Sequence, residues 1–382
     1  MMLFICNTAY QLFNAVNLKL QVFPDDEGDI ILSDHSDFND VYLRLCGSGL
    51  FENVWRTKSL YLARNFYFFS DDEKYAALMN PTKKIKACLD IDYLKYTHIF
   101  VANVDGYVNL IYRHLILNES NCKMNYFEDG WSTYTTDWSQ FALSPFEKYY
   151  CYILNEAVFQ KNIINIYVYE PRLGCHQDKF RYLKIPQIDK TNVMIKEKIN
   201  LIFGYSTSPE YKRRCIFLEE AFSQDGYKNN DMELVNEVAS KVGVEQLLLK
   251  RHPRLTENRF ADKGVYANKD FNIPWEVHIL NNKFSEKILF TITSGAVLTP
   301  RLVFGEATFS VYLRDLLRGP VSSIYKSKEF RQFITNFRRI YPNELYIPKT
   351  KESIMICVEA IQKEMQNREY IFDNSDVEDK LE

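Results

Sequence analysis

The sequence predicts an α/β fold in which two doubly wound domains each contain a parallel sheet with helices on both faces. Three observations lead to this prediction. Buried-type strands alternate with helical stretches over most of the chain, the alternation stops at a stretch rich in proline and charge, and the same pattern then begins again. The length of 382 residues also fits two domains, each large enough to bury a core.

The first half begins with an apolar strand, after which Leu12, Val16 and Leu20 recur at helical spacing. Residues 107–117 have one apolar face and are expected to form an amphipathic helix. Residues 171–198 carry prolines and little periodicity, which is typical of a linker. The strands expected before this linker are residues 3–6, 29–32, 98–102, 123–127 and 163–169.

After the linker the pattern restarts and predicts the second domain. Strands are expected at residues 201–203, 246–249, 288–292 and 309–313, and helices at residues 211–222, 232–242 and 352–365. The resulting organisation has domains at residues 1–185 and 199–345, a helix within residues 346–372 and an acidic tail at residues 373–382.

The composition argues against several classes of protein. Glycine is scarce, at 13 residues, and no glycine-rich phosphate loop follows a strand, which argues against dinucleotide enzymes and P-loop NTPases. The 47 basic and 50 acidic residues nearly balance, which argues against a nucleic-acid partner. Eight scattered cysteines without a Cys-x-x-Cys pair indicate reduced thiols in a cytoplasmic protein. The apolar run at residues 1–6 is too short for a signal sequence or a spanning helix.

Acidic residues follow the expected strand at residues 123–127. Glu128 and Asp129 come first and Gly130 lets the chain turn. A partly buried carboxylate beside another has a raised pKa and can act as a general base. Because side chains alternate along a strand, only one of the two acids should face a ligand. The same residues also fit an ordinary acidic turn.

A basic cluster follows the expected strand at residues 246–249. It reads Lys250, Arg251, His252, Pro253 and Arg254. Cations attract a phosphate and a histidine can donate a hydrogen bond or a proton to it, so the cluster indicates a phosphate site. A solvated basic turn is the alternative.

Small hydroxyl residues follow the expected strand at residues 288–292. Thr293, Ser294 and Gly295 would open a helix, where hydroxyls and backbone N–H groups can bind an anion or simply cap the helix. Before them, Glu276 could accept hydrogen bonds from a ribose diol or face solvent in the first turn of a helix.

Together the three motifs resemble those of bacterial sialyltransferases, in particular glycosyltransferase family 52, the lipooligosaccharide and capsule type. Such families carry an Asp/Glu-Asp-Gly motif, then a His-Pro motif and then a Ser/Thr motif. Here these are Glu128-Asp129-Gly130, His252-Pro253 and Thr293-Ser294, in that order. The opening Asn7-Thr8-Ala9-Tyr10-Gln11 is also similar to this group. The resemblance covers the chain from the first strand to the third motif.

The resemblance implies a GT-B-type fold of two Rossmann-like domains that face each other across a cleft, with the last helix often packing back on the first domain. It implies an inverting reaction without a cofactor or metal, from CMP-sialic acid to a galactose-terminated glycan of the cell surface. Asp129 would be the general base, His252 would stabilise the departing phosphate with Thr293 and Ser294, and Glu276 would hold the ribose. Further donor-binding residues would be Lys250, Pro253, Arg254 and Gly295, and acceptor-binding residues Tyr10, Gln11, Glu128, Gly130 and Trp131.

Several alternatives remain open at this stage. Arg251 and Trp131 depart from the motifs and leave room for a GT-B polysaccharide glycosyltransferase with another nucleotide sugar. A non-catalytic sugar-nucleotide-binding partner in capsule assembly is a second alternative. Asp90-Ile91-Asp92 matches a metal-binding pattern but precedes a strand instead of following one.

An aromatic and basic stretch at residues 330–339 has two interpretations. Phe330, Phe333 and Phe337 either pack inward on a helix or, with the neighbouring arginines, rest on an anionic bilayer that holds a lipid-linked acceptor. The scattered cysteines predict a cytoplasmic location, and this stretch adds peripheral membrane contact as an option. A homodimer also remains open, since some relatives form dimers.

Overall fold

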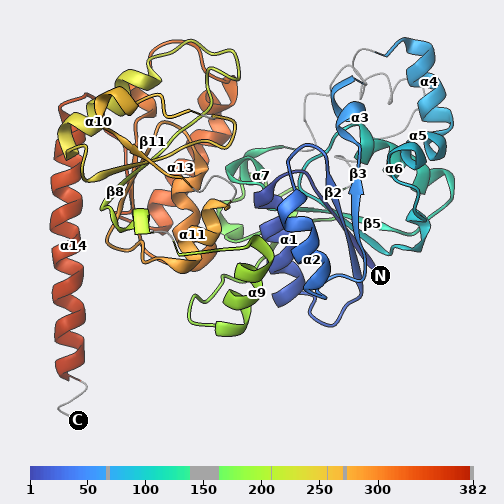
Figure 1. The fold of residues 1–382 in the computed structure, drawn as a ribbon, viewed down its shortest axis with the longest axis horizontal. Helices are drawn as coiled ribbons and strands as arrows, with labels where there is room; N and C mark the ends of the chain where they lie inside the picture. The colour runs from blue at the N-terminus through green and yellow to red at the C-terminus, as the bar shows by residue number, and fades with distance from the viewer. Residues whose placement is uncertain (66–68, 138–162, 208, 256, 270–272, 379–382) are drawn as a thin grey trace. The chain divides into compact units, whose positions relative to one another are not determined.

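The computed structural model describes residues 1–65, 69–137, 163–207, 209–255, 257–269 and 273–378 (Figure 1). Contacts divide the chain into two compact units, Met1–Tyr205 and Ser206–Glu382. Each unit is a parallel sheet with helices packed against it, which confirms the predicted fold class.

The first unit is built on seven parallel strands among its described residues. In chain order they are β1 (Met2–Cys6), β2 (Gly28–Ser33), β3 (Val54–Thr57), β4 (His98–Val101), β5 (Lys123–Phe127), β6 (Asn165–Val168) and β7 (Arg181–Lys184). Their order in the sheet is β3-β2-β1-β4-β5-β6-β7. Phe4 of β1 stacks on Phe100 of β4, with ring centroids 4.7 Å apart, and meets Phe127 of β5 edge-on at 6.3 Å. Three neighbouring strands thus share one aromatic core.

Helices of the first unit begin where polar residues follow the strands. Thr8, two residues beyond β1, caps the first helix by accepting a hydrogen bond from the backbone N–H of Gln11 at 3.2 Å. Asp105, beyond β4, caps another by accepting from the N–H groups of Tyr107 and Val108. The helices are α1 (Ala9–Gln21), α2 (Asn39–Gly47), α3 (Leu60–Asn65), α4 (Asp71–Met79), α5 (Pro81–Cys88), α6 (Gly106–Leu117), α7 (Trp131–Thr135) and α9 (Val193–Phe203).

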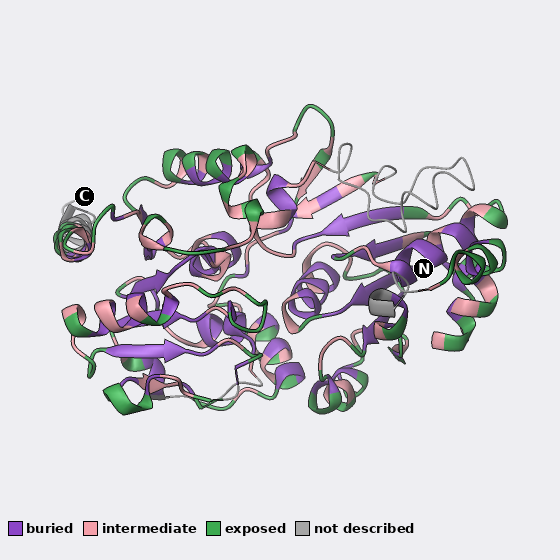
Figure 2. Ribbon diagram, turned by 90° about the horizontal axis from the view of Figure 1, so that it is seen from above, coloured by how far each residue is buried: buried purple, intermediate pink, exposed green. Residues whose placement is uncertain are grey.

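The second unit is built on six parallel strands among its described residues. They are β8 (Cys215–Leu218), β9 (Leu247–Lys250), β10 (Tyr266–Ala267), β11 (Ile288–Thr291), β12 (Phe309–Tyr312) and β13 (Leu345–Tyr346). Their order in the sheet is β10-β9-β8-β11-β12-β13. The four residues of each of the strands β8, β9, β11 and β12 are all buried (Figure 2).

Five helices accompany this sheet in the described part of the second unit. They are α10 (Asp231–Val242), α11 (Trp275–Asn281), α12 (Thr299–Phe304), α13 (Lys328–Ile340) and α14 (Ser353–Glu378). Leu234 and Val238 of α10 join Phe217 and Phe290 of the sheet in the core.

The stretch expected to be a linker instead belongs to the first unit. Residues 181–184 form its edge strand β7, and the expected strand at residues 201–203 is the end of α9. Ile195, Ile199 and Ile202 recur at helical spacing on its buried face, and Gly204 ends the helix with φ of +64°. The unit boundary therefore falls at Tyr205, later than the expected domain end at residue 185.

The prediction of a helix at residues 211–222 is also wrong. A 3₁₀ turn, Pro209–Lys212, is followed by β8, whose residues Cys-Ile-Phe-Leu are all buried. A strand buried on both faces has no alternation, so its apolar run of four cannot be told from part of a helix by periodicity.

The last helix, α14, packs on the second unit along the part whose side chains are described. Within the described side chains of α14, Ile354, Val358, Ile361 and Met365 pack into the core of the second unit. Their spacing of three or four residues places them on one face of the helix. They meet core residues of β8, β9, β11 and α10.

The aromatic residues of α13 pack inward. Phe330, Phe333 and Phe337 are each at most 1% exposed, whereas Arg331, Arg338 and Arg339 lie on the exposed face. The aromatic side chains are therefore not available to a bilayer.

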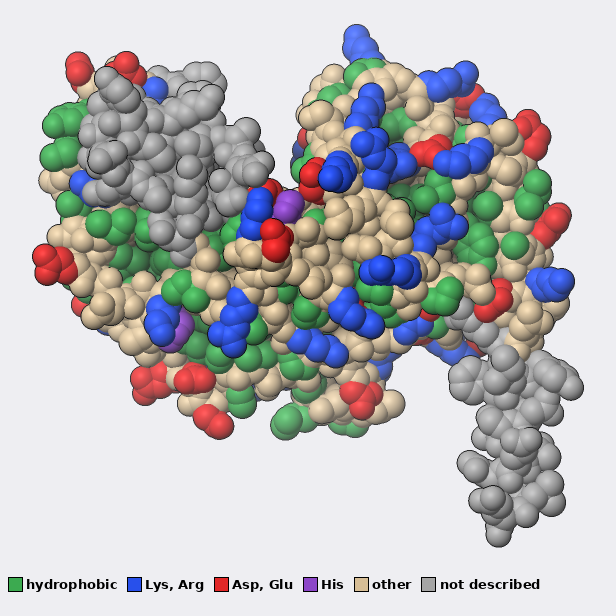
Figure 3. Space-filling model, turned by 180° about the vertical axis from the view of Figure 1, so that it is seen from behind, with side chains coloured by type: hydrophobic (Ala, Val, Ile, Leu, Met, Phe, Trp, Pro, Cys, Tyr) green, Lys and Arg blue, Asp and Glu red, His purple; other side chains and the backbone are tan. Residues whose placement is uncertain are grey.

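Lys and Arg side chains gather on the second unit in the face shown in Figure 3.

Asp29 of β2 offers a stability test of the first sheet. Its buried carboxylate accepts hydrogen bonds from the Asn53 backbone at 3.0 Å, the Lys95 ammonium at 2.8 Å and the Tyr96 hydroxyl at 2.6 Å. These donors lower the pKa of Asp29 despite its burial. We expect Asp29→Asn to reduce the free energy of unfolding by about 2 kcal/mol at pH 7, because an amide N–H would face buried donors.

Chemical denaturation at several pH values measures this effect. A group with a lowered pKa stabilises the fold above its ordinary pKa, so the difference between the two proteins should shrink as the pH falls toward 3. Asp25→Asn, at an exposed position, is the matched control. Equal stability of Asp29→Asn and the wild type at pH 7 would contradict the assignment.

Candidate active site

The acidic motif lies at the carboxyl end of β5, as predicted. Gly130 has φ of +85°, a conformation that favours glycine, and it begins α7. The turn is fixed because the backbone N–H of Asp129 donates to the Thr133 hydroxyl at 2.8 Å. Asn14 of α1 donates to the Glu128 carbonyl at 3.0 Å. The motif is thus anchored both by its own helix and by α1.

Glu128 and Asp129 lie in different environments, as the alternation of side chains predicts. Glu128 is 1% exposed, and burial raises its pKa to about 8, with the Asp129 charge adding to this effect and the Tyr134 hydroxyl opposing it. Asp129 is partly exposed, and desolvation raises its pKa to about 7. Asp129 is therefore the acid that can both meet a ligand and exchange a proton near neutral pH.

Gln11 of α1 connects the opening motif to the acidic motif. A hydrogen bond from its side chain lowers the pKa of Asp129. Its Oε1 accepts from the Asn7 backbone N–H at 2.7 Å, which leaves its amide N–H₂ for the Asp129 carboxylate. Gln11 is buried, while Tyr10 and Trp131 are partly exposed. Of the expected acceptor residues, the structure joins Gln11, Glu128 and Gly130 directly to Asp129.

Sequence reasoning missed Asp105 and His35, which lie beside Asn7 at the same edge of the sheet. Asn7 Nδ2 donates to Asp105 Oδ2 at 3.4 Å, and His35 Nε2 lies 3.8 Å from that oxygen. His35 Nδ1 also lies 3.0 Å from the Ser33 hydroxyl. Asn7 directly follows β1, and His35 and Asp105 come a few residues after β2 and β4, so their positions shortly after strands were the available signal.

The basic motif lies at the carboxyl end of β9. Lys250 is the last residue of β9. The Leu255 N–H donates to the His252 carbonyl at 2.8 Å, which closes a turn that has Pro253 at its second position. Proline favours that position because its φ is fixed. The motif is therefore a rigid turn directly after a buried strand.

His252 is held in its neutral form. Burial, together with Arg254 and Lys250, lowers its pKa to about 4. Its Nδ1 accepts from the Arg254 backbone N–H at 3.2 Å, so the proton of the neutral ring is on Nε2. His252 is thus a hydrogen-bond donor through Nε2 at neutral pH.

The two arginines of the motif are engaged by other residues. The Arg251 backbone N–H donates to Asn268 Oδ1 at 2.8 Å, and its guanidinium donates to the Asn268 carbonyl at 3.1 Å. The Arg254 guanidinium forms a bidentate ion pair with the Asp225 carboxylate, with N–O distances of 2.6 and 3.1 Å. Arg251 therefore has a structural contact, and Arg254 would have to leave or share Asp225 to bind a phosphate.

Lys250 and Glu276 are both buried, and each affects the pKa of the other. Glu276 lies in the first turn of α11, and burial raises its pKa to about 7 while Lys250 opposes the shift. Burial lowers the pKa of Lys250 to about 8, and Glu276 opposes that shift. The structure thus brings two of the expected donor-binding residues into one electrostatic environment.

The Thr-Ser motif follows β11, and Glu220 already occupies its donor groups. Glu220 accepts from the Thr293 backbone N–H at 2.9 Å and from the Thr293 hydroxyl. Ser294 caps the following turn by accepting from the Ala296 N–H at 3.3 Å, and Gly295 begins that turn. Sequence reasoning missed Glu220 because the strand before it was taken as a helix.

The Asp-x-Asp pattern has local contacts at the opposite end of the strands. Asp90 pairs with Lys86 at 3.4 Å, and Asp92 caps the 3₁₀ turn Tyr93–Lys95. Both line a cavity of about 380 Å³ together with His114. In the described part of the chain, no three His, Cys, Asp or Glu side chains form a group that could hold a metal ion. Among the same residues, no helix is long and apolar enough to cross a membrane.

Solved structures share the fold at low sequence identity. The glycotransferase of kitacinnamycin matches with a TM-score of 0.54 at 10% identity, over 94% of this chain and 89% of that one. UGT89C1 of Arabidopsis thaliana, solved with UDP, matches with a TM-score of 0.51 at 10% identity over the same shares. These likenesses establish a GT-B-type architecture of two α/β units, as predicted. The search of curated protein sequences gave no significant match.

The sequence itself matches a family model over most of its length. The model describes alpha-2,8-polysialyltransferases and covers residues 2–313, which include the acidic, His-Pro and Thr-Ser motifs. This supports the expected resemblance at the level of a sialyltransferase family. The chain therefore belongs to the alpha-2,8-polysialyltransferase family of glycosyltransferases.

Proposed function

We propose that this protein is an inverting, metal-independent sialyltransferase that moves sialic acid from CMP-sialic acid to a hydroxyl of a cell-surface glycan. The motif resemblance implies a galactose hydroxyl, and the name of the matched family implies the 8-hydroxyl of a sialic acid. The observation that carries the proposal is the state of Asp129, a partly exposed carboxylate with a pKa of about 7 at the carboxyl end of β5. Family membership supports a nucleotide-sugar donor and a glycan acceptor. Capsule polysaccharide or lipooligosaccharide is the class of acceptor that the resemblance suggests.

Asp129 supplies the base in this mechanism. Its carboxylate takes the proton of the acceptor hydroxyl while that oxygen attacks the anomeric carbon of the donor. The bond from that carbon to the CMP phosphate oxygen breaks, and its electron pair leaves with the phosphate. Burial keeps the pKa of this carboxylate high, and Gln11 holds it by a hydrogen bond.

His252 stabilises the negative charge of the leaving group. Its Nε2–H donates a hydrogen bond to the phosphate oxygen, and Lys250 adds positive charge in a buried environment where such interactions are strong. Because the leaving group carries one phosphate, a histidine and a lysine can stabilise it without a divalent ion. Glu276, when ionised, accepts hydrogen bonds from the ribose hydroxyls.

The acceptor sugar has stacking partners in the first unit. Tyr10 and Trp131 are partly exposed next to residues that contact Asp129, and aromatic rings pack well on the apolar faces of sugars. Analysis of the product of the reaction would identify the acceptor sugar and the linkage that is formed.

Asp129→Asn tests the base. The variant should retain CMP binding but lose transfer by a factor of about 10² or more, because an amide cannot accept the proton. In the wild type, the rate at saturating donor should rise with pH through about 7 as Asp129 loses its proton. Initial rates from pH 5 to 9 measure both effects.

Asp90→Asn is the matched control for this experiment. Asp90 is exposed and belongs to the Asp-x-Asp pattern, so its replacement should leave the rate unchanged. If Asp129→Asn turns over like the wild type, Asp129 is not the base. If Asp90→Asn is the inactive variant, the metal-dependent alternative is favoured.

His252→Ala tests the leaving-group contact. Loss of a hydrogen bond to a charged phosphate should weaken CMP binding and lower the rate by roughly 10-fold to 100-fold each. His252→Gln keeps an N–H donor and should recover part of both losses. Calorimetric titration with CMP measures binding, and unchanged affinity in His252→Ala would refute the phosphate contact.

A panel of nucleotides tests the donor. CMP should raise the melting temperature more than UMP or UDP at equal concentration, because a ligand that binds the folded state stabilises it. Neither this shift nor the rate with CMP-sialic acid should change on addition of EDTA. A larger shift with UDP would instead support a GT-B enzyme with another nucleotide sugar.

A further inference from the structure

Two adjacent glutamates directly follow β8, the strand that lies in the sheet between β9 and β11, after which the two donor-binding motifs begin. β8 pairs with β9 on one side and with β11 on the other. Glu219 and Glu220 follow its last residue, Leu218. Successive side chains at a strand end point to different sides, so two neighbouring acids can reach two different loops.

Glu219 reaches the loop of the His-Pro motif. Its side chain is 1% exposed, and its carboxylate accepts from Arg259, whose guanidinium also pairs with Asp231. Burial raises the pKa of Glu219, and Arg259 and a hydrogen bond from the backbone N–H of His252 oppose that rise. The Glu219 backbone N–H donates to the Lys250 carbonyl at 2.9 Å. Glu219 is thus bonded to Lys250 through its backbone and to His252 through its carboxylate.

Glu220 reaches the loop of the Thr-Ser motif. One carboxylate oxygen accepts from the Thr291 hydroxyl at 3.2 Å and from the Ile292 N–H at 3.0 Å. The other accepts from both the N–H and the hydroxyl of Thr293. These four bonds hold three consecutive residues around a single side chain.

We propose that Glu219 and Glu220 are positioning residues that set the two donor-binding loops, Glu219 the His252 turn and Glu220 the turn at Thr293. The inference rests on the proposed function, since it takes these loops to be the donor site. It changes the expected role of Thr293: neither its N–H nor its hydroxyl is available to a phosphate while Glu220 accepts from both. Thr293 then acts through the shape of its turn.

Glu220→Gln tests the second loop. One oxygen becomes an N–H₂ group that faces buried donors, so we expect the Kd for CMP to rise about 10-fold or more. Thr293→Val should have a similar effect, and the double variant should bind CMP about as weakly as either single one. Thr293→Ser keeps the hydroxyl and should bind like the wild type. Full additivity of the two changes would overturn the proposal for Glu220.

Glu219→Gln tests the first loop in the same way. CMP binding should weaken by about 10-fold in the wild-type background and by much less in the His252→Ala background, because the effect passes through His252. Equal losses in both backgrounds would overturn the proposal for Glu219.

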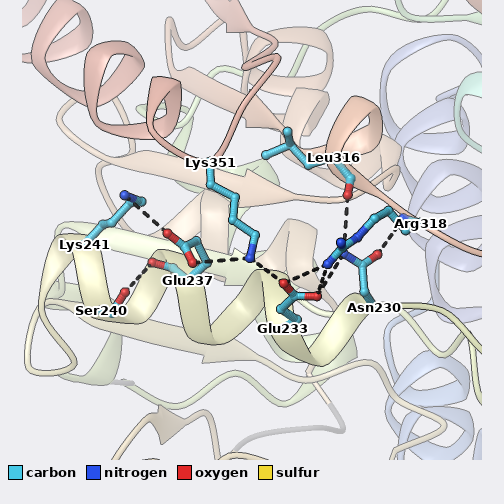
Figure 4. A network of polar contacts seen from close by, with 8 residues as sticks. All are labelled: Asn230, Glu233, Glu237, Ser240, Lys241, Leu316, Arg318 and Lys351. Carbon is cyan, nitrogen blue, oxygen red and sulfur yellow. Dashed lines mark hydrogen bonds and ion pairs between the residues drawn. The ribbon is translucent and has the colours of Figure 1, made fainter.

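Glu233→Gln is the matched control. Glu233 of α10 accepts from Arg318 and Lys351 in a network in the same unit (Figure 4). No residue of the donor motifs belongs to the eight residues of this network. The control should lose ion contacts elsewhere in the same unit yet bind CMP like the wild type. An equal loss of CMP binding in Glu233→Gln would reduce the effect of Glu220 to general destabilisation and overturn the proposal.

Amide hydrogen exchange separates this inference from the proposed function. In Glu220→Gln the N–H groups of Ile292 and Thr293 should lose protection, whether or not CMP is the ligand. A wild-type protein that fails to bind CMP would refute the proposed function alone. A wild type that binds CMP, with both glutamine variants equal to it in affinity and protection, would refute the positioning roles alone.

Discussion

The functional residues depend on one constraint, the burial of short parallel strands on both faces. β1 and β5 in the first unit and β8, β9 and β11 in the second contain almost only buried residues. A strand of this kind has no room for an unpaired polar side chain until it ends. Polar residues therefore accumulate directly after the strands, and parallel pairing brings several such ends to one edge of the sheet.

Desolvation at these strand ends sets the protonation of the candidate site. It raises the pKa of the acids Asp129 and Glu276 to about 7 and lowers the pKa of the bases Lys250 and His252 to about 8 and about 4. The direction is the same in every case, toward the neutral form. A neutral histidine and a carboxylate near its point of ionisation result from burial, and hydrogen-bond partners such as Gln11 then decide the geometry.

The sequence predicted the strand ends better than the contacts made there. β5 begins and ends at the predicted residues 123 and 127 because a charged lysine and an acidic pair bound a short run of mostly apolar residues. The pairing of Arg254 with Asp225 and of Thr293 with Glu220 joins distant positions and leaves no local pattern. The error at residues 211–222 removed β8 from the predicted sheet, and Glu219 and Glu220 could not then be recognised as strand-end residues.

The contacts of Glu220 agree with the absence of a glycine-rich phosphate loop from the sequence. A glycine-rich loop binds phosphates by leaving several backbone N–H groups open toward the ligand. Here two such N–H groups, of Ile292 and Thr293, are already bound to a carboxylate of the protein itself. In the proposed mechanism the phosphate is then bound mainly by the side chains of His252 and Lys250, which offer few donors. Such a site suits the single phosphate of a nucleoside monophosphate better than the two of a diphosphate, which agrees with the proposed CMP leaving group.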